Sequence, residues 1–389
     1  MSKVADNEVP LVSELRPITL LNSDYKILTG ILSKRILKVL KSVIKSSQSS
    51  CVPGANICSS AFNLVSLAQA VEQRNGQAAI LSLDIYKAYD NVNLQYLEQV
   101  LLAMNFDPVF VSWILLLHAN TKTKLLLNRM SDPFTKNAAV RQGDPVSMIL
   151  FIIYFEPFLL RMNDVTSGFK LCAPIVGATM DSLVEAASEE QESYVDDANG
   201  CLTSDAEFVE VDWLVGWFES LSGAILNRDC KSKVMGLGSW CHRNVWPLPW
   251  LSTVQKMKVF GFILHPCYKT MLQLNWEAQL TKVNNTLFSW SNRSINSLYE
   301  RAKIIRTFVL SRVWYRAHVF LLPSPWASKF ESAITNYLWK GQQFRNLLSL
   351  ESVCQPIKEG GLGIPYLCAK CDSLAQTNVA NDFFYREKF

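Results

Sequence analysis

Two adjacent carboxylates, Asp196 and Asp197, are the side chains whose types and spacing most directly suggest chemistry. They follow Tyr194-Val195, a pair that favours a strand, and precede Asn199-Gly200, a dipeptide typical of tight turns. The pattern predicts a hairpin that bends at Asn199-Gly200, with both acids near the bend. Two like charges side by side repel one another unless a multivalent cation neutralises them. This stretch alone is therefore either a metal site or an exposed acidic turn.

A third aspartate, Asp84, ends the apolar run of residues 78–84, which predicts a buried strand. Nucleotidyl transfer uses two divalent cations roughly 3.5–4 Å apart, and carboxylates from different strands hold them. If the strand that ends at Asp84 pairs with the acidic hairpin in one antiparallel sheet, the three acids come together. Oxygen ligands with no histidine nearby suit Mg²⁺.

The composition indicates a folded chain with a large core, since 49% of the 389 residues are hydrophobic and 19% are charged. The net charge of +4 is compatible with a nucleic-acid partner but does not argue for one. The longest apolar run, residues 148–155, is too short to cross a bilayer. The scattered cysteines and the N-terminal residues, which are not a signal peptide, predict an intracellular protein with reduced thiols. We expect Cys368 and Cys371 to be ordinary helix thiols.

The elements that must position the acids change character along the chain. An α+β region is expected up to about residue 265, followed by a helical region. In the first region the patterns predict helices at 57–74, 93–104, 107–119, 146–162 and 204–222. They predict strands at 78–84, 121–128 and 233–235, and at 257–264 with an interruption at Gly261. In the second region they predict helices at 274–292, 298–320 and 326–339.

A long amphipathic helix is expected to begin at Ser23. Its apolar positions recur at helical spacing: Ile27, Leu28, Ile31, Leu32, Ile36, Leu37, Leu40 and Ile44. Lysine and arginine occupy the remaining face. That face is either simply solvated or directed at phosphate groups, and the sequence leaves both interpretations open.

Seven short motifs occur in one order along residues 10–265. They are LRPITLLN at 15–22, DYKIL at 24–28, VPG at 52–54, SLDIYKAYD at 82–90, VRQGDP at 140–145, YVDD at 194–197, and SGAILN with KS at 222–232. Each motif alone is weak, but seven in order form a strong signal. On these motifs the chain resembles the reverse transcriptase domain of a non-LTR (LINE-type) retrotransposon.

This resemblance implies a right-hand polymerase fold with an antiparallel palm sheet. Partial fingers would occupy residues 1–76, and the palm residues 77–265, with further fingers elements at about 107–140. A helical thumb and C-terminal extension would occupy residues 266–389. The match of this last region to the family is less specific.

The resemblance also implies roles for single residues at the reaction centre. Asp84 and Asp196 would be direct ligands of two Mg²⁺ ions, with Mn²⁺ as the alternative metal, and Asp197 would support Asp196. Lys231 would donate a proton to pyrophosphate, although Lys233 and Arg228 are close enough in sequence to compete for that role.

Further residues would bind the substrates. Tyr89 matches the position whose ring blocks a ribose 2′-hydroxyl, unless it is only a core aromatic. Gln142 and Gly143 would lie against the nucleotide and the template. Arg16 would contact the triphosphate through its guanidinium fork, unless it is only a surface arginine. Phe260-Gly261 resembles the turn of the primer-gripping hairpin.

The implied activity is RNA-directed DNA polymerisation by two-metal nucleotidyl transfer, with an RNA template, a DNA primer or target, and dNTPs as partners. No membrane partner is expected, and the oligomeric state is left open. The expected location is the nucleus, a cytoplasmic ribonucleoprotein, or both. The bulk of Tyr89 argues against an RNA-dependent RNA polymerase.

The alternative is a catalytically impaired nucleic-acid-binding remnant of a retrotransposon polyprotein. The family's endonuclease and zinc knuckle have no counterpart in these 389 residues. The chain also begins shortly before Arg16. We therefore expect a truncated domain, and the alternative predicts RNA binding without primer extension.

Overall fold

The computed structural model divides the chain into two units. The first comprises Met1–Ile57 and Asn75–Val254, and the second comprises Cys58–Arg74 and Gln255–Phe389. The structure describes residues 19–44, 48, 52–54, 56–119, 121–126, 130–136, 140–166, 169–172, 185–189, 191–194, 197–228, 231–295, 297–340 and 350–386. Arg16 and Asp196 lie outside these residues. The predicted boundaries of fingers, palm and thumb stay a prediction.

A five-stranded sheet is the centre of the first unit, with strand order β6-β7-β1-β8-β9. The central strand β1 (Gln77–Asp84) pairs antiparallel with both β7 (Asp197–Leu202) and β8 (Lys233–Gly238). At the edges, β6 (Gln191–Tyr194) is antiparallel to β7, and β9 (Ser252–Thr253) is parallel to β8. This confirms the predicted strand that ends at Asp84 and its antiparallel pairing with β7 of the acidic hairpin, whereas the pairing with β8 was not predicted.

The hairpin between β6 and β7 bends at a different place from the one predicted. Tyr194 pairs with Asp197, so β6 connects to β7 between these two residues, and Asp197 lies next to this connection as expected. Asn199 and Gly200 lie inside β7, opposite Ser82 and Leu81 of β1, so the predicted turn there is wrong. A Cβ at Gly200 would come within 2.8 Å of Met162 Cε in the helix behind the sheet. Gly200 therefore gives this helix room to pack.

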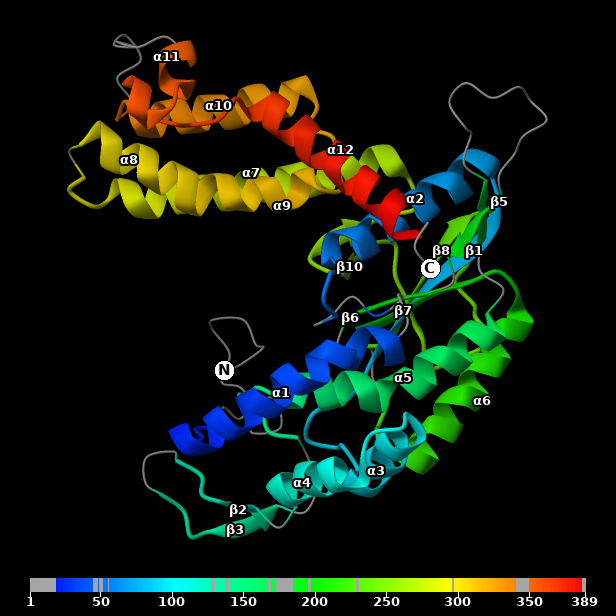
Figure 1. Ribbon diagram of the computed structural model, residues 1–389. Helices are drawn as coiled ribbons and strands as arrows, with labels where there is room; N and C mark the ends of the chain where they lie inside the picture. The colour runs from blue at the N-terminus through cyan, green and yellow to red at the C-terminus, as the bar shows by residue number, and fades with distance from the viewer. Residues whose placement is uncertain are drawn as a thin grey trace. The chain divides into compact units, whose positions relative to one another are not determined.

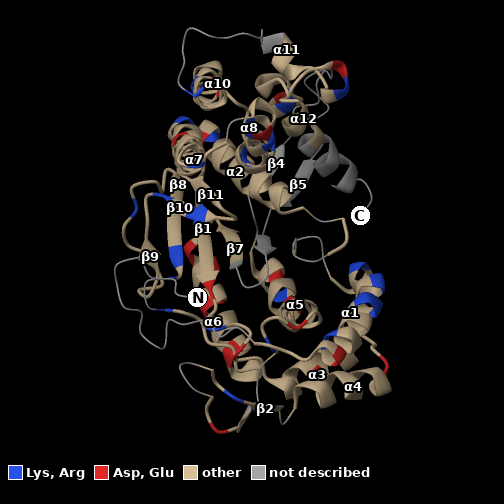
Figure 2. Cartoon of the chain, turned by 90° about the vertical axis from the view of Figure 1, so that its left-hand side faces the viewer, with Lys and Arg blue, Asp and Glu red and all other residues tan. Residues whose placement is uncertain are grey.

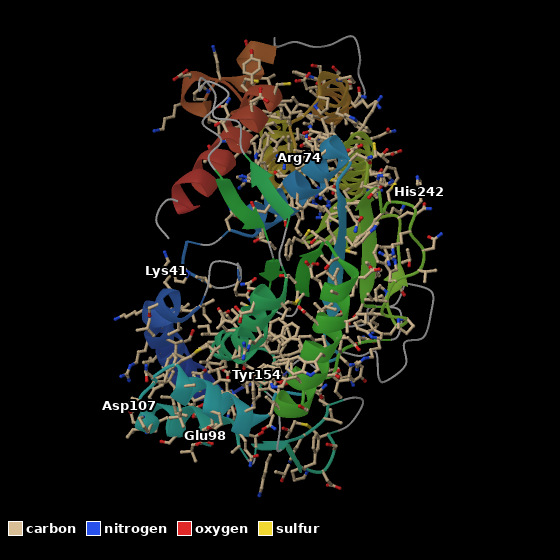
Figure 3. The ribbon with its side chains drawn as sticks, turned by 90° about the vertical axis from the view of Figure 1, so that its right-hand side faces the viewer. Lys41, Arg74, Glu98, Asp107, Tyr154 and His242 are labelled. Carbon is tan, nitrogen blue, oxygen red and sulfur yellow. The ribbon has the colours of Figure 1, made fainter. Side chains whose placement is uncertain are left out.

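Five helices accompany the sheet of the first unit (Figure 1). They are α1 (Ser23–Val43), α3 (Leu94–Ala103), α4 (Pro108–His118), α5 (Ser147–Val165) and α6 (Asp205–Ser222). The apolar helix α5 lies at the core of the group, because 12 of its 19 residues are buried. Its Tyr154, labelled in Figure 3, packs edge-on against Tyr96 and Phe218 and donates to the Ser222 carbonyl oxygen at 2.9 Å.

Among the described residues of the first unit there are two further antiparallel strand pairs. They are β2 (Thr121–Thr123) with β3 (Phe134–Lys136), and β4 (Phe169–Cys172) with β5 (Glu185–Glu189). The strand predicted over residues 121–128 therefore ends earlier, at Thr123.

Helix α1 buries fewer of its apolar residues than predicted. Leu32, Ile36 and Leu40 are buried, whereas Ile27 is 65% exposed and Ile31 is 52% exposed. At 3.6 residues per turn, Ile27 and Ile31 project on the side opposite Ile36, so they share the cationic face. Figure 2 shows the lysines and arginines gathered along this helix.

The second unit is largely helical. It contains α2 (Ile57–Arg74), the hairpin β10 (Met257–Val259) and β11 (Phe262–Leu264), α7 (Tyr268–Ser291), α8 (Leu298–Ile304), a π-helical turn η2 (Ile305–Leu310), α9 (Ser311–Ala317), α10 (Ser324–Leu338), α11 (Leu350–Cys354), a 3₁₀ turn η3 (Ile357–Glu359) and α12 (Leu367–Arg386). The helix predicted over 298–320 is thus three segments joined through a π turn. The core of the second unit includes Trp276, Phe320 and Phe330.

Cys368 and Cys371 both lie in α12, as predicted for helix thiols. Within the described ranges, no three His, Cys, Asp or Glu side chains cluster so that they could hold a metal ion. In the same residues, no helix is both long and apolar enough to cross a membrane.

Candidate active site

Asp84 and Asp197 are paired directly across β1 and β7. Residues paired in this way have Cα atoms roughly 4.5–5.5 Å apart. Asp84 is the last residue of β1 and Asp197 is the first of β7, so both acids lie at the same end of the sheet. The strand of Asp84 therefore pairs antiparallel with β7 of the acidic hairpin in one sheet, as the sequence predicted.

The carboxylate of Asp84 is held by residues of the 222–232 motif. Asn227 Nδ2 donates to Asp84 Oδ2 at 2.9 Å, and the Asn227 backbone N–H donates to the Asp84 carbonyl at 2.8 Å. Ser232 Oγ accepts from the Asp84 backbone N–H at 3.3 Å and donates to the Asn227 carbonyl at 2.9 Å. Both partners are buried. Sequence reasoning quoted these residues as a motif but assigned them no role.

Lys231 immediately precedes Ser232, which brings its backbone next to that of Asp84, and its side chain is exposed. Of the two competitors, Arg228 forms a two-pronged pair with the Glu219 carboxylate at 2.9 and 2.7 Å. Lys233 is half-buried in β8, opposite Ser82. Arg228 is therefore already engaged, and Lys231 stays the predicted proton donor.

Tyr89 lies within a sharp turn that follows β1. Lys87 has a φ of +44°, and its carbonyl accepts from the backbone N–H groups of Asp90 and Asn91. The half-buried Tyr89 ring stacks on Phe151 of α5, with centroids 5.2 Å apart. Its carbonyl accepts from Val140 N at 3.0 Å, which brings the 82–90 motif beside the 140–145 motif. Tyr89 is thus neither fully exposed nor a fully buried core residue.

Gly143 lies at a tight approach of two chain segments. It has a φ of +94°, and a Cβ there would lie 3.2 Å from the Thr19 carbonyl oxygen. A side chain would be strained in this conformation. Gln142 beside it is half-buried, and Gly143 is exposed. The backbone conformation therefore requires glycine, while the predicted nucleotide contact stays a prediction.

A buried polar network anchors the residues around Gln142. Tyr25 Oη donates to Asp144 Oδ2 at 2.9 Å, and the Arg141 guanidinium lies 4.7 Å above the Tyr25 ring. His118 Nδ1 lies 2.9 Å from the Ile114 carbonyl oxygen, and its Nε2 faces Asp144 Oδ2 at 3.6 Å. A carbonyl can only accept, so Nδ1 carries a proton.

Sequence reasoning missed both Tyr25 and His118 in this network. Tyr25 belongs to the 24–28 motif, which could have identified it. His118 lies in no motif, so the sequence carried no comparable signal for it.

Phe260 and Gly261 form the turn of the β10–β11 hairpin in the second unit. Their φ angles are +50° and +81°, and Val259 pairs with Phe262 across them. Two successive residues with positive φ match the right-handed twist of a two-residue hairpin. The interruption predicted at Gly261 is therefore a turn, and the primer-gripping role stays a prediction.

Comparison with known proteins identifies the family of this chain. Residues 5–211 match the family described as "Reverse transcriptase (RNA-dependent DNA polymerase)". A Xenopus laevis "Transposon TX1 uncharacterized 149 kDa protein" is 28% identical over 376 residues, 92% of this chain and 26% of that protein. A Popillia japonica Pol polyprotein from the type-1 retrotransposable element R2 is 29% identical over 90 residues, 23% of this chain and 15% of that protein.

Solved structures give a weaker likeness. A Candida albicans telomerase bound to a telomeric RNA fragment covers 83% of this chain and 57% of its own, at 10% identity and a TM-score of 0.49. Apo telomerase from Candida tropicalis covers 83% and 60%, at 10% identity and a TM-score of 0.44.

The chain spans about a quarter of the length of the frog transposon protein, since the match covers 26% of it. The two transposon relatives agree with the predicted non-LTR type, and the α+β sheet at Asp84 agrees with the expected polymerase fold. Because the family match over residues 5–211 covers more than half of the 389 residues, the chain belongs to the reverse transcriptase family of RNA-dependent DNA polymerases.

Proposed function

We propose that this chain carries the polymerase centre of a non-LTR retrotransposon reverse transcriptase, which extends a DNA primer on an RNA template with dNTPs. The observation that carries the proposal is the cross-strand pairing of Asp84 with Asp197 at one end of the antiparallel sheet. Family membership alone would not distinguish a working centre from a decayed one. This pairing supports the working centre, because it holds two of the three predicted acids at neighbouring positions.

The donor set fits a divalent cation that prefers oxygen, because the three predicted ligands are carboxylates. Asp84 and Asp196 would hold Mg²⁺, with Mn²⁺ as the alternative, and Asp197 would support Asp196. When bound, two such ions would activate the primer 3′-hydroxyl and stabilise the leaving pyrophosphate. Asn227 would orient the Asp84 carboxylate through its 2.9 Å hydrogen bond and leave Oδ1 for a ligand.

The other predicted residues would select and place the nucleotide. Tyr89, held by its stack on Phe151, would exclude a ribose 2′-hydroxyl. Gln142 and Gly143 would lie against the nucleotide and template, Arg16 would contact the triphosphate, and Lys231 would protonate pyrophosphate. The proposed partners are therefore an RNA template, a DNA primer and dNTPs, met in the nucleus or in a cytoplasmic ribonucleoprotein.

Primer extension tests the proposal. The purified chain is given a labelled DNA primer on an RNA template with dNTPs and Mg²⁺. We expect extension that Asp84→Asn or Asp196→Asn lowers by at least about 100-fold, because metal ions contribute several kcal/mol to such reactions. Asp132→Asn removes an exposed carboxylate outside the site and should leave the rate unchanged.

Two outcomes would contradict the proposal. Extension that survives Asp84→Asn would show that the activity comes from another site or a contaminant. Salt-dependent RNA binding by the wild-type chain without any Mg²⁺-dependent extension would instead support the nucleic-acid-binding remnant.

A further inference from the structure

Helix α1 of the first unit carries an exposed face that is apolar at one end and cationic at the other. Its residues are Ile27, Ile31, Lys34, Lys38 and Lys41, and all five are exposed. They follow one another at steps of four, three, four and three residues, which is the spacing with which one helix packs along another. Lys41 is labelled on this helix in Figure 3.

Helix α4 widens this face on one side. Tyr25 Oη donates to the Leu117 carbonyl at 3.4 Å, and the Arg35 guanidinium lies 5.6 Å from the centroid of the Phe110 ring. The two helices are therefore antiparallel neighbours. A groove of about 400 Å³ beside them is lined by Arg35 and Phe110 among others. Trp113 of α4 is 48% exposed, so the apolar surface continues from α1 onto α4.

The charges of this face are not balanced by the first unit. Helix α1 contains five lysines and arginines against one aspartate. Among the described residues, no carboxylate forms an ion pair with Lys34, Lys38 or Lys41. A partner that covers the α1–α4 face must therefore supply both apolar side chains and negative charges.

Helix α6 has the opposite character on its own exposed face. Val209, Trp213, Gly216 and Ser220 are exposed there and follow one another at steps of four, three and four residues. Val209 is 61% exposed and Trp213 is 68% exposed. A tryptophan can bury roughly 150–250 Å² of surface, so covering this indole would contribute much to an interface. The outer face of α6 thus has the spacing and the apolar residues of a packing surface.

The charges of α6 complement those of α1. The helix contains five aspartates and glutamates and no lysine or arginine. Two of these acids pair with arginines outside the helix. Within the described ranges, Glu210 and Asp212 form no ion pair with a cationic side chain. Unneutralised acids therefore lie beside exposed apolar residues on α6.

We propose that this chain self-associates by seating the outer face of α6 from one copy on the α1–α4 face of another. Both faces are exposed in the same chain, so they do not cover each other within one copy. A second copy is favoured over a nucleic-acid strand because a phosphate backbone offers no apolar partner to Ile27, Ile31 and Trp113. Helix α6 offers apolar side chains and acids together.

Sedimentation velocity of the full chain tests for association. The protein is first freed of nucleic acid with a nuclease and is then compared between about 1 and 100 μM, the range that suits a weak interface. We expect the average mass to rise with concentration and to rise less in about 0.5 M KCl, because salt screens the charge pairs. A chain that stays monomeric throughout, or that associates only before nuclease treatment, would overturn the inference.

Charge reversal identifies the two faces. One variant combines Lys34→Glu with Lys38→Glu, and the other combines Ala206→Lys with Glu210→Lys. Each should lower the association constant at least about ten-fold, because like charges then face one another. The first variant keeps a native α6 and the second a native α1, so an equal mixture should associate again. Undiminished association of either variant alone, or no recovery in the mixture, would contradict the assigned faces.

Controls in the second unit separate these faces from overall charge and exposed apolar area. Lys303→Glu with Lys329→Glu makes the same charge change as the α1 variant at exposed positions. Phe288 is 69% exposed, so Phe288→Ala matches Trp213→Ala. We expect both controls to associate like the wild type and Trp213→Ala to lose association without a lower unfolding temperature. Equal losses in the control and test variants would overturn the inference.

Discussion

The Asp84 side chain depends on residues that are about 140 positions further along the chain. Asn227 and Ser232 bind its carboxylate and its backbone N–H, and both are buried. A buried amide aimed at a carboxylate fixes the direction in which the second oxygen points. The 222–232 motif is therefore as much a part of this site as the acids themselves.

His118 gives a pH-dependent prediction. Burial lowers the pKa of His118 below its usual value of about 6.5; Asp144 opposes this shift and Arg141 adds to it. Below pH 6.5 the unfolded chain therefore binds a proton that the folded chain resists, so stability falls as the pH drops. We expect this loss to reach up to about 1.4 kcal/mol per pH unit and to be absent in His118→Gln.

Urea unfolding, monitored by fluorescence at several pH values between 7.5 and 5.5, gives the free energy of unfolding and its slope with pH. Replacing a buried histidine also lowers stability at pH 7.5, so the comparison concerns the slope with pH and not the absolute value. His242, labelled in Figure 3, is exposed, and His242→Gln should keep the wild-type slope. If the free energy of unfolding of His118→Gln falls with decreasing pH at the wild-type slope, the protonation of His118 is not the cause of the pH dependence.

At the scale of elements, two glycines lie on the strands that flank β1, and they differ in what an added Cβ would contact. Gly200 of β7 pairs with Leu81, and Gly236 of β8 pairs with Ala79. A Cβ at Gly236 would lie 2.0 Å from the Trp240 carbonyl oxygen, which is backbone. A Cβ at Gly200 would lie 2.8 Å from Met162 Cε, the end of a flexible side chain. Only the Met162 side chain can move aside at low cost, whereas the Trp240 backbone cannot.

We therefore predict that Gly236→Ala destabilises the first unit by more than about 2 kcal/mol, because the backbone of the turn at Trp240 must shift. Gly200→Ala should cost about 1 kcal/mol or less, since the methionine can change rotamer. Thermal unfolding of the two variants under identical conditions measures the difference. Equal losses, or a larger loss for Gly200→Ala, would contradict it.

Local patterns predicted most elements and failed where packing overrides them. The apolar run before Asp84 and the helix from Ile57 to Arg74 were correct, because burial and helical spacing alone specify them. Asn199-Gly200 has the composition of a turn, yet it lies in β7, where both residues pair with β1 and Gly200 leaves room for Met162 of α5. The π turn at Ile305–Leu310 has no signature in the residue pattern.

The site was predictable to a similar degree. Ordered motifs indicated the family because several weak matches in one order reinforce one another, and the role of Asp84 stays a prediction. The pairing of Asp84 with Asp197 needed only the assumption of one antiparallel sheet. His118 could not be found this way, because its importance lies in a buried contact with Asp144, which is further along the chain.

At the scale of the whole molecule, the second unit is discontinuous in sequence. The segment Cys58–Arg74 belongs to it although the chain returns to the first unit before reaching residue 255. Glu72 Oε2 accepts from the Tyr268 backbone N–H at 2.7 Å, at the first turn of α7. The N-cap residue Cys267 provides no side-chain hydrogen bond of its own. A residue of α2 thus caps a helix that begins about 200 positions later.

This cap gives a prediction about how the two sequence segments are coupled. Glu72→Ala removes an acceptor and a negative charge from the N-terminus of α7, which should cost about 1 kcal/mol. That loss corresponds to about five-fold faster hydrogen exchange of the Tyr268 amide, with α5 unchanged. Glu72→Gln keeps an acceptor but loses the charge, so it should fall between the wild type and Glu72→Ala. If the exchange of Tyr268 were the same in all three proteins, α2 would not stabilise α7 through this contact.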